Sequence, residues 1–327
     1  MAVLVTGAAG FIGYHVSAAL LARGENVIGI DNLNDYYDVN LKLARLKPLK
    51  DNPAFQFHDI DLADRAAMVR LARAHPDITR IVHLGAQAGV RFSLIDPYAY
   101  VSSNLMGHVT VLELARNLKH LEHMVYASSS SVYGGNEKVP FSVADAVETP
   151  QSLYAATKRA DELMSYTYAH LYGLKLTGLR FFTVYGPWGR PDMAPMLFTK
   201  AILSGQPIRV FNNGEMWRDF TYIDDIVAGI LAILAKAPEQ ATSNVPPHKV
   251  YNIGNSRSEK LTDFIATLET ALGRKAERKF EPMQPGDVVR TYADISDTTR
   301  DFGYEPTTPI SVGIPKFVAW YRSFYDM

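Results

Sequence analysis

The sequence predicts an α/β fold in which helices cover both faces of a parallel sheet and a smaller α/β domain lies over the carboxyl ends of the strands. Three observations predict it. Short apolar runs alternate with amphipathic stretches, a glycine-rich turn follows the first apolar run, and glycine- and proline-rich turns dominate after Phe182. Alternation of strand and helix at this spacing implies right-handed crossovers between parallel strands.

The first half of the chain supplies the expected strands and helices in order. Strands are expected at Val3–Thr6, Asn26–Ile30, Phe55–His58, Ile81–Leu84 and His123–Ala127, and Val250–Ile253 reads as one more strand. Helices are expected from about Phe11, near Leu41, and over Ala63–Ala74, Pro97–Leu118 and Ser152–Leu171. The last two either cover the sheet only or pack against a second copy, which would give a homodimer through a four-helix bundle.

The change of pattern predicts two interleaved domains. Residues 1–180 with about 219–256 form the larger, sheet domain, and about 181–218 with 257–327 form the smaller one. The second domain is expected to bind the substrate because it lies over the strand ends.

The composition argues against several classes of function. The 327 residues carry a formal net charge of -1 and no cysteine, which excludes thiol chemistry and gives no basic footprint for nucleic acid. The longest apolar stretch, Ile226–Ala235, is about half of what a membrane helix needs. We therefore expect a cytoplasmic protein with no membrane or nucleic-acid partner. No histidine cluster has ligand spacing, so no metal is predicted.

The glycine-rich turn predicts a dinucleotide site. Gly7, Gly10 and Gly13 surround Phe11 and Ile12 and lead into a helix, whose positive end suits a pyrophosphate. A turn without a ligand is the alternative for the glycines taken alone. Together with the strand that precedes it, the turn is typical of a Rossmann-type, doubly wound domain.

The second strand ends at Asp31, about 18 residues past Gly13, where a carboxylate can accept hydrogen bonds from ribose hydroxyls and repel a 2′-phosphate. No Arg or Lys follows directly, so NAD is preferred to NADP. Asp61 and Leu62 are expected near the adenine, with a solvated helix cap as the alternative for Asp61. The other residues expected around the cofactor are Asn32, Asn34, Leu84, Ala86, Gln87 and Asn104, the last of which is equally a helix-cap residue.

Tyr154 and Lys158 predict a catalytic site in which the tyrosine acts as the base. They are four residues apart and therefore share one face of a helix. A free phenol titrates near ~10, but an ammonium and a positive nicotinamide both favour the phenolate that a base needs. A hydroxyl from the run Ser128–Ser131, directly after a strand, is expected beside them, although four serines also suit a polar loop.

These motifs resemble the extended short-chain dehydrogenase/reductase family, which contains the NAD-dependent epimerases and dehydratases. The resemblance rests on GxxGxxG, Asp31, the SSSSVYG run at 128–134, YxxxK, and the LRFFTVYGPWGRPDM stretch at 179–193. Within the family the chain is most similar to UDP-glucuronate 4-epimerases, nearly end to end. The resemblance implies tightly bound NAD that is regenerated each cycle.

The resemblance also implies a mechanism and its residues. Tyr154, helped by Ser129, removes the proton of the sugar 4-hydroxyl while the C4 hydride passes to NAD, and both return to the other face of a 4-keto sugar. Arg190 resembles the arginine that binds the glucuronate carboxylate, with an exposed turn arginine as the alternative. The other residues expected at the UDP-sugar are Arg91, Ser129, Ser130, Thr183, Arg218 and Arg290; a structural salt bridge to Asp224 or Asp225 is the alternative for Arg218, and Arg290 follows the turn Pro285–Asp287.

Related reactions remain to be separated. Dehydratases of this family need an Asp and a Glu directly after the catalytic hydroxyl, and UDP-xylose-forming decarboxylases typically carry a Glu at the second of these positions; here Ser130 and Ser131 occupy them. Epimerisation of UDP-glucose or UDP-N-acetylglucosamine is the alternative within the enzyme class, and decarboxylation of UDP-glucuronate is less favoured. An NAD-bound sensor without turnover is disfavoured because Tyr154, Lys158 and Ser129 are all present.

Overall fold

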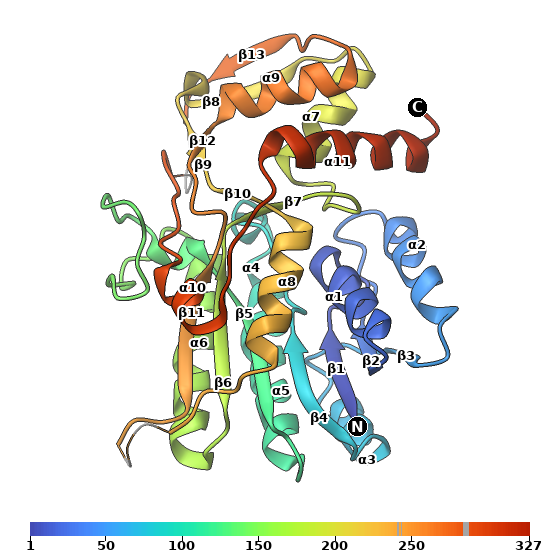
Figure 1. Cartoon of the computed structure of the whole chain (residues 1–327), viewed down its shortest axis with the longest axis vertical. Helices are drawn as coiled ribbons and strands as arrows, with labels where there is room; N and C mark the ends of the chain where they lie inside the picture. Colours follow the sequence, from blue (N-terminus) through green and yellow to red (C-terminus); the bar gives the residue numbers. More distant parts are fainter. Residues whose placement is uncertain (241, 243, 284–287) are drawn as a thin grey trace.

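The computed structural model describes residues 1–240, 242, 244–283 and 288–327. A seven-stranded sheet forms its centre, in the order β11-β6-β5-β4-β1-β2-β3, and every neighbouring pair is parallel (Figure 1). The predicted α/β class with a doubly wound parallel sheet is confirmed. The strands are β1 (Ala2–Thr6), β2 (Asn26–Asp31), β3 (Phe55–Asp59), β4 (Ile78–His83), β5 (His123–Ser129), β6 (Leu176–Phe181) and β11 (His248–Ile253).

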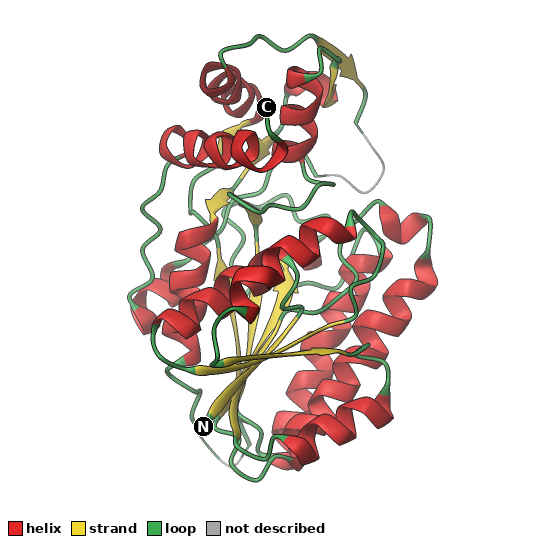
Figure 2. Ribbon diagram, turned by 90° about the vertical axis from the view of Figure 1, so that its right-hand side faces the viewer, coloured by secondary structure: helices red, strands yellow, loops and turns green. Residues whose placement is uncertain are grey.

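Helices lie on both faces of this sheet (Figure 2). One face carries α1 (Phe11–Ala22), α2 (Val39–Lys50) and α8 (Ile223–Leu234), and the other carries α3 (Arg65–Ala74), α5 (Gly107–Asn117) and α6 (Leu153–Tyr172). Because both faces are covered, the central strands are continuous apolar runs: all five residues of β1 are buried.

The strand order indicates where a ligand-binding crevice is expected. β1 lies between β2 and β4, so the chain winds away from β1 in opposite directions in its two halves. In open parallel sheets ligands bind outside the carboxyl ends of the strands at such a switch point. The turns after β1 and β4 therefore border the expected site.

A second region stands over the carboxyl ends of the strands (Figure 1). Its sheets are three pairs, β10-β7, β12-β9 and β13-β8. Its elements are β7 (Thr183–Tyr185), α7 (Ala194–Leu203), β8 (Ile208–Phe211), β9 (Trp217–Arg218), β10 (Phe220–Tyr222), β12 (Glu259–Lys260), α9 (Leu261–Leu272), β13 (Arg278–Glu281) and α11 (Ile310–Tyr325).

One helix of the C-terminal segment returns to the large sheet. α10 (Ser296–Phe302) lies against β11, where the Thr298 hydroxyl donates to the Asn252 carbonyl at 2.6 Å and the Tyr251 hydroxyl donates to Asp301 at 2.7 Å. The domain division at about residues 181, 219 and 257 stays a prediction.

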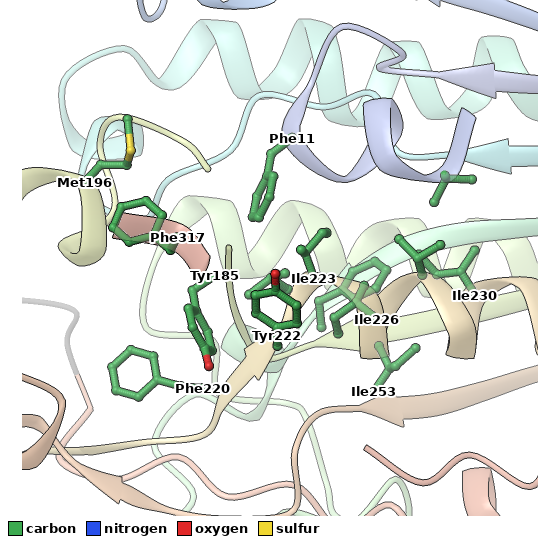
Figure 3. Close-up of a cluster of buried hydrophobic side chains, with 14 of the residues drawn as sticks. Phe11, Tyr185, Met196, Phe220, Tyr222, Ile223, Ile226, Ile230, Ile253 and Phe317 are labelled. Atoms are coloured by element: carbon green, nitrogen blue, oxygen red, sulfur yellow. The ribbon is translucent and has the colours of Figure 1, made fainter. Parts of the chain in front are cut away.

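The hydrophobic core joins the two regions. Figure 3 shows side chains from α1, α8 and the second region in one cluster. Phe11 starts α1, Ile226 and Ile230 come from α8, and Phe220 and Phe317 come from the second region, all less than a tenth exposed. Burial of this much apolar surface stabilises the placement of the second region over the strand ends.

The segment expected as one helix over Pro97–Leu118 is interrupted. α4 (Pro97–Tyr100) continues into a π-helical turn, η2 (Val101–Met106), before α5 begins at Gly107. Such turns occur often at functional sites. Within the described part of the chain, no helix combines the length and the apolarity that crossing a bilayer requires.

Candidate active site

A cavity of about 780 Å³ opens between the carboxyl ends of the strands and the second region. Nearly all of the predicted site residues line it, although they come from segments spread over the chain. The predicted residues that line it are Gly7, Gly10, Phe11, Ile12, Gly13, Asp31, Asn32, Asn34, Asp61, Leu62, Leu84, Ala86, Gln87, Arg91, Ser129, Ser130, Tyr154, Lys158, Thr183, Arg190 and Arg218.

The glycine turn is built so that only glycine fits. Gly7 has a φ of +70°, and a Cβ on Gly13 would lie 2.0 Å from the Gly7 carbonyl oxygen. Gly10 is the N-cap of α1 and no side chain caps this end. The first-turn amides of α1 thus have no acceptor within the helix and face the cavity, an arrangement that fits a pyrophosphate. The turn therefore fits NAD.

Asp31 is fixed at the end of β2 by backbone amides. Its Oδ2 accepts from the Ala9 N–H at 3.2 Å and its Oδ1 from the Leu33 N–H at 2.9 Å. Burial raises the pKa of the Asp31 carboxyl above its usual range, and the ammonium of Lys42 opposes this rise. Lys42 lines the cavity and donates to the Asn34 carbonyl at 2.6 Å. No motif in the sequence indicates Lys42, which stands eleven positions after Asp31 in a separate helix.

Asp61 lies in the turn before α3. Its carboxylate accepts from Asn32 Nδ2 at 2.9 Å and from the Ala63 N–H at 2.8 Å. The helix itself is capped by Asp64, which accepts from the Ala67 N–H at 3.0 Å. Asp61 thus ties the ends of β2 and β3 together beside the cavity, and its contact with adenine stays a prediction.

Tyr154 and Lys158 occupy the first turns of α6, which starts at the N-cap Ser152. The Lys158 ammonium is buried and donates to the Ala127 carbonyl at 3.2 Å and to Asp161 Oδ2 at 3.0 Å. Burial alone would lower the pKa of Lys158, but the Asp161 carboxylate raises it above its ordinary value. Lys158 therefore remains a cation one helical turn from the phenol.

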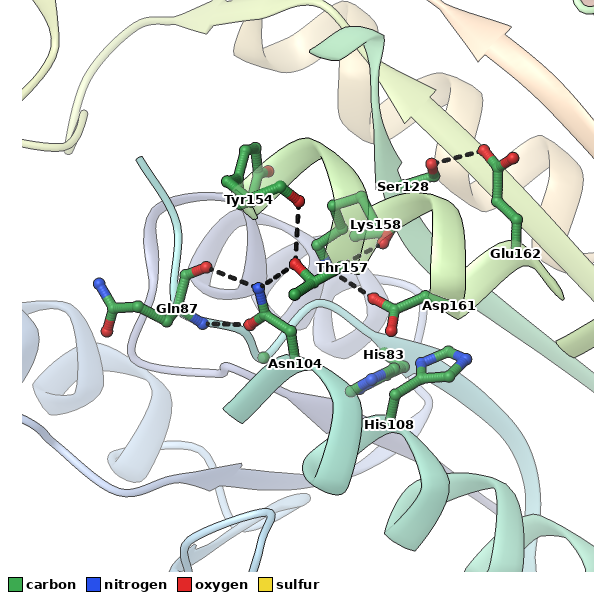
Figure 4. A network of polar contacts seen from close by, with 12 residues as sticks. His83, Gln87, Asn104, His108, Ser128, Tyr154, Thr157, Lys158, Asp161 and Glu162 are labelled. Carbon is green, nitrogen blue, oxygen red and sulfur yellow. Dashed lines mark hydrogen bonds and ion pairs between the residues drawn. The ribbon is translucent and has the colours of Figure 1, made fainter. Parts of the chain in front are cut away.

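Asn104 lies behind the cavity and connects it to α6 (Figure 4). It accepts from the Gln87 N–H at 2.8 Å and donates to the Gln87 carbonyl at 3.1 Å. It also donates to Thr157 Oγ1 at 2.9 Å, and that hydroxyl donates to the Tyr154 carbonyl at 2.9 Å. This chain fixes the loop after β4 to the turn that carries Tyr154.

The serines at the end of β5 have different surroundings. Ser128 donates to Glu162 Oε1 at 2.6 Å, farther along α6 than Tyr154 (Figure 4). Ser129 accepts from the Ser131 N–H at 3.1 Å, and its side chain lines the cavity. The geometry is compatible with the predicted role of Ser129, which stays a prediction.

Arg190 is held by an acid of its own turn. Its Nε donates to Asp192 Oδ1 at 3.1 Å and its Nη2 to Asp192 Oδ2 at 2.5 Å, while the Tyr36 hydroxyl donates to the same carboxylate at 3.0 Å. Burial would lower the pKa of Arg190, but Asp192 raises it above its usual range; the phenol of Tyr154 acts in the same direction. Sequence reasoning missed Tyr36 and Asp192, although Asp192 stands two residues after Arg190.

The remaining arginines are placed differently. Arg91 stacks on the Phe211 ring, with its guanidinium carbon 4.6 Å from the ring centre. Arg218 donates to the Trp217 and Val289 carbonyls at 2.9 and 3.1 Å. Arg290 lies outside the cavity lining and donates to Ser258 at 3.2 Å.

Three further expectations from the sequence concern an alternative partner of Arg218, the turn before Arg290 and a metal ion. Asp225, a predicted alternative partner of Arg218, accepts from the Thr307 and Thr308 amides. The turn Pro285–Asp287 lies outside the described residues. Among those that are described, no group of three or more His, Asp or Glu side chains is arranged to hold a metal ion.

Known proteins share both the sequence and the fold. The model of the NAD dependent epimerase/dehydratase family matches residues 3–254. UDP-glucuronate 4-epimerase 3 of Arabidopsis thaliana is 49% identical over 333 residues, which cover 99% of this chain and 77% of that protein. The UDP-glucuronic acid 4-epimerase of Bacillus cereus, solved with UDP-glucuronic acid and NAD, superposes with a TM-score of 0.89 at 35% identity, covering 99% of this chain and 100% of that chain.

A neutral-sugar enzyme has the same fold. The UDP-glucose 4-epimerase of Thermotoga maritima superposes with a TM-score of 0.87 at 30% identity, covering 99% of this chain and 100% of that chain. The fold alone therefore does not determine which sugar is the substrate. The family match over residues 3–254 covers well over half of the sequence. The chain belongs to the NAD dependent epimerase/dehydratase family.

Proposed function

We propose that this protein is an NAD-dependent UDP-sugar 4-epimerase that interconverts UDP-glucuronate and UDP-galacturonate. The observation that carries the proposal is that Tyr154 and Lys158 line the same cavity as the glycine turn and the partly buried Arg190. UDP-glucuronate 4-epimerases that are 47–49% identical over almost the whole chain support it.

The residues divide the reaction between them. The Tyr154 phenolate takes the proton of the sugar 4-hydroxyl, and the Ser129 hydroxyl donates a hydrogen bond to the same oxygen as the ketone forms. The Lys158 cation favours the phenolate. Bound NAD supplies the acceptor, and then the donor, of the C4 hydride. After the 4-keto sugar turns its other face, Tyr154 returns the proton and the configuration at C4 is inverted.

Arg190 would select the uronic acid. A guanidinium forms paired, charge-assisted hydrogen bonds with a carboxylate. Held at this position, the substrate carboxylate is restrained near the plane of the C4 ketone, which opposes loss of CO₂. Ser130 and Ser131 stand where elimination would need carboxyl groups, so dehydration is disfavoured.

The first experiment is incubation of the purified protein with UDP-glucuronate and no added reductant, with the products resolved by NMR. UDP-galacturonate at a stable ratio is expected, and the Tyr154→Phe variant should give none. Formation of a UDP-pentose and CO₂ would overturn the proposal in favour of decarboxylation. If UDP-glucose or UDP-N-acetylglucosamine is turned over in place of UDP-glucuronate, the carboxylate pocket has been misassigned.

We further propose a cytoplasmic homodimer formed by α4, η2, α5 and α6, which pack side by side. Large apolar side chains on these elements and just before them are exposed: Ile95 by 76%, Tyr98 by 83% and Leu163 by 53%. Two copies of such a face would give a four-helix bundle and bury these side chains. The lack of cysteine supports the location, because no disulfide is needed.

Sedimentation equilibrium tests the assembly. The wild type is expected to be dimeric, and the double variant Tyr98→Asp, Leu163→Asp should be monomeric. A monomeric wild type at micromolar concentration would contradict the proposed dimer. Cell fractionation of the tagged protein tests its location.

A further inference from the structure

A buried acid lies behind the proposed catalytic lysine. Tyr154, Lys158 and Asp161 follow one another at helical spacing along the inner side of α6 (Figure 4). The side chains of Lys158 and Asp161 are 4% and 1% exposed and form an ion pair of 3.0 Å. Asp161 does not line the cavity, so it would touch neither substrate nor cofactor.

The ion pair uses only half of this carboxylate. Asp161 Oδ1 is buried and has no hydrogen-bond partner among the described residues. A buried carboxylate without its full set of hydrogen bonds is costly. Packing alone therefore gives no reason for an acid at this position, where a small apolar side chain would avoid that cost.

The neighbouring acid does not share this role. Glu162 accepts two hydrogen bonds from Arg180, at 2.8 and 2.9 Å, and one from Arg159 at 3.0 Å. These cations lower the pKa of Glu162 against the effect of burial. Arg180 and Arg159 thus balance the charge of Glu162, whereas Lys158 balances the charge of Asp161.

The other titratable groups around the pair carry no charge at neutral pH. Burial lowers the pKa of His108 to about 3 and that of His83 well below its usual range. Burial likewise raises the pKa of Tyr126, which packs from β5, well above its usual range. Asp161 is therefore the main negative charge on the ammonium of Lys158, and Glu162 contributes less.

We propose that Asp161 is a positioning residue for Lys158, which holds the ammonium against the Ala127 carbonyl and screens part of its charge from Tyr154. The inference rests on the proposed epimerase function, in which Lys158 favours the Tyr154 phenolate. Two opposite charges at this distance interact strongly in a site of low dielectric constant. Wherever Lys158 is protonated, a neutral side chain at position 161 leaves more of the lysine field on the phenol and so favours the phenolate.

Protonation of Asp161 has the same effect on the Tyr154 phenolate as a neutral side chain at position 161. Burial raises the pKa of the Asp161 carboxyl to about 6, although Lys158 opposes the rise. Above about pH 6 the carboxylate is ionised and screens Lys158; below it the carboxyl is neutral and the screening ends. The acid thus dampens the dependence of the Tyr154 phenolate on pH near pH 6.

The test compares the wild type with Asp161→Asn, which keeps the shape and one oxygen for Lys158. The acid limb of the pH profile of kcat/KM for UDP-glucuronate is expected to move down by about one pH unit. KM should stay within about twofold, because the residue lies outside the cavity. The matched control is Glu148→Gln, an exposed carboxylate on the loop before α6, whose limb should not move. An unchanged limb in Asp161→Asn overturns the inference.

A measurement without substrate separates this inference from the proposed function. Ultraviolet difference titration of the NAD-loaded protein follows tyrosinate, and subtraction of Tyr154→Phe in each background isolates Tyr154. Tyrosinate should appear at lower pH in Asp161→Asn even if UDP-glucuronate is not turned over. Coincident titrations would overturn the inference even in an active epimerase. Asp161→Ser replaces the asparagine variant if that variant does not fold.

Discussion

Asp192 occupies one edge of the Arg190 guanidinium, with Nε to Oδ1 at 3.1 Å and Nη2 to Oδ2 at 2.5 Å. The acid fixes the plane of the arginine, and the Tyr36 hydroxyl fixes the acid. A substrate carboxylate would approach the other edge, formed by the two terminal nitrogens. The turn thus presents a pre-oriented cation, which reduces the entropy lost when the substrate binds.

Removal of this cation should weaken uronate turnover. For Arg190→Ala we expect kcat/KM for UDP-glucuronate to fall about 10- to 100-fold, the loss of a charge-assisted hydrogen-bond pair. Some UDP-pentose should appear, because the carboxylate is no longer restrained. Arg190→Lys keeps the positive charge but loses the paired nitrogens of the guanidinium, so its kcat/KM should lie between those of the wild type and of Arg190→Ala. If NMR shows full turnover of UDP-glucuronate by the alanine variant, the assignment of Arg190 to the substrate carboxylate is contradicted.

Loss of Asn104 should disturb the site from behind. Asn104→Ala leaves the Gln87 amide and carbonyl and the Thr157 hydroxyl without their partner in a buried region. An unsatisfied buried polar group costs about 1–3 kcal/mol, so the free energy of unfolding should fall by that amount. We also expect a lower kcat, because the turn that carries Tyr154 is less fixed. Denaturant unfolding and steady-state kinetics measure both, and a variant equal to wild type in both would refute the role.

A methyl group in the glycine turn should weaken cofactor binding. The Cβ of Gly13→Ala would lie 2.0 Å from the Gly7 carbonyl oxygen, so the turn must open and its amides must move. We expect NAD affinity to fall at least ~10-fold, measured by calorimetry on protein freed of nucleotide. In the control Gly135→Ala the nearest atom, 3.2 Å away, is the end of the flexible Gln151 side chain, so affinity should be retained. Equal NAD affinity in both variants would contradict the placement of the pyrophosphate.

What could be predicted from the sequence was local. The strand, the glycine turn and the helix that follow one another from Ala2 to Ala22 need only neighbouring residues to be recognised, and so does the helical spacing of Tyr154 and Lys158. The order of strands then brings the two motifs together, because parallel crossovers leave few alternatives. The confirmed fold follows from these local patterns.

What could not be predicted depends on contacts between distant segments. Tyr36 meets Asp192 across 156 residues, and no spacing rule signals this. Arg45, in the middle of α2, resembles an exposed helix residue in the sequence but is fully buried. Its guanidinium donates to the Ala9 carbonyl at 2.9 Å and to the Trp188 carbonyl at 2.6 Å, and so joins the glycine turn to the turn that carries Arg190.

The second region offers a stability test that does not involve the cavity. Glu269, on α9, accepts from Lys275 at 2.8 Å and from Arg278 at 2.9 Å. Burial would raise the pKa of Glu269, but these hydrogen bonds lower it to about 2. A carboxyl whose pKa is lowered by folding stabilises the protein above its unfolded pKa, near ~4.3, and this contribution is lost as pH falls toward about 2.

Glu269→Gln should therefore lower the free energy of unfolding at about pH 7. We expect about 1–2 kcal/mol, less than the pKa shift alone implies, because Lys275 reaches the acid from solvent. The difference from wild type should shrink steadily as the pH of denaturant unfolding is lowered from about 5. Glu215→Gln, which removes an exposed partner of Lys260, is the control and should change stability little at any pH. A Glu269→Gln deficit that is independent of pH would contradict this account, because glutamine keeps the size of the side chain and an effect of its charge must disappear as the wild-type carboxyl is protonated.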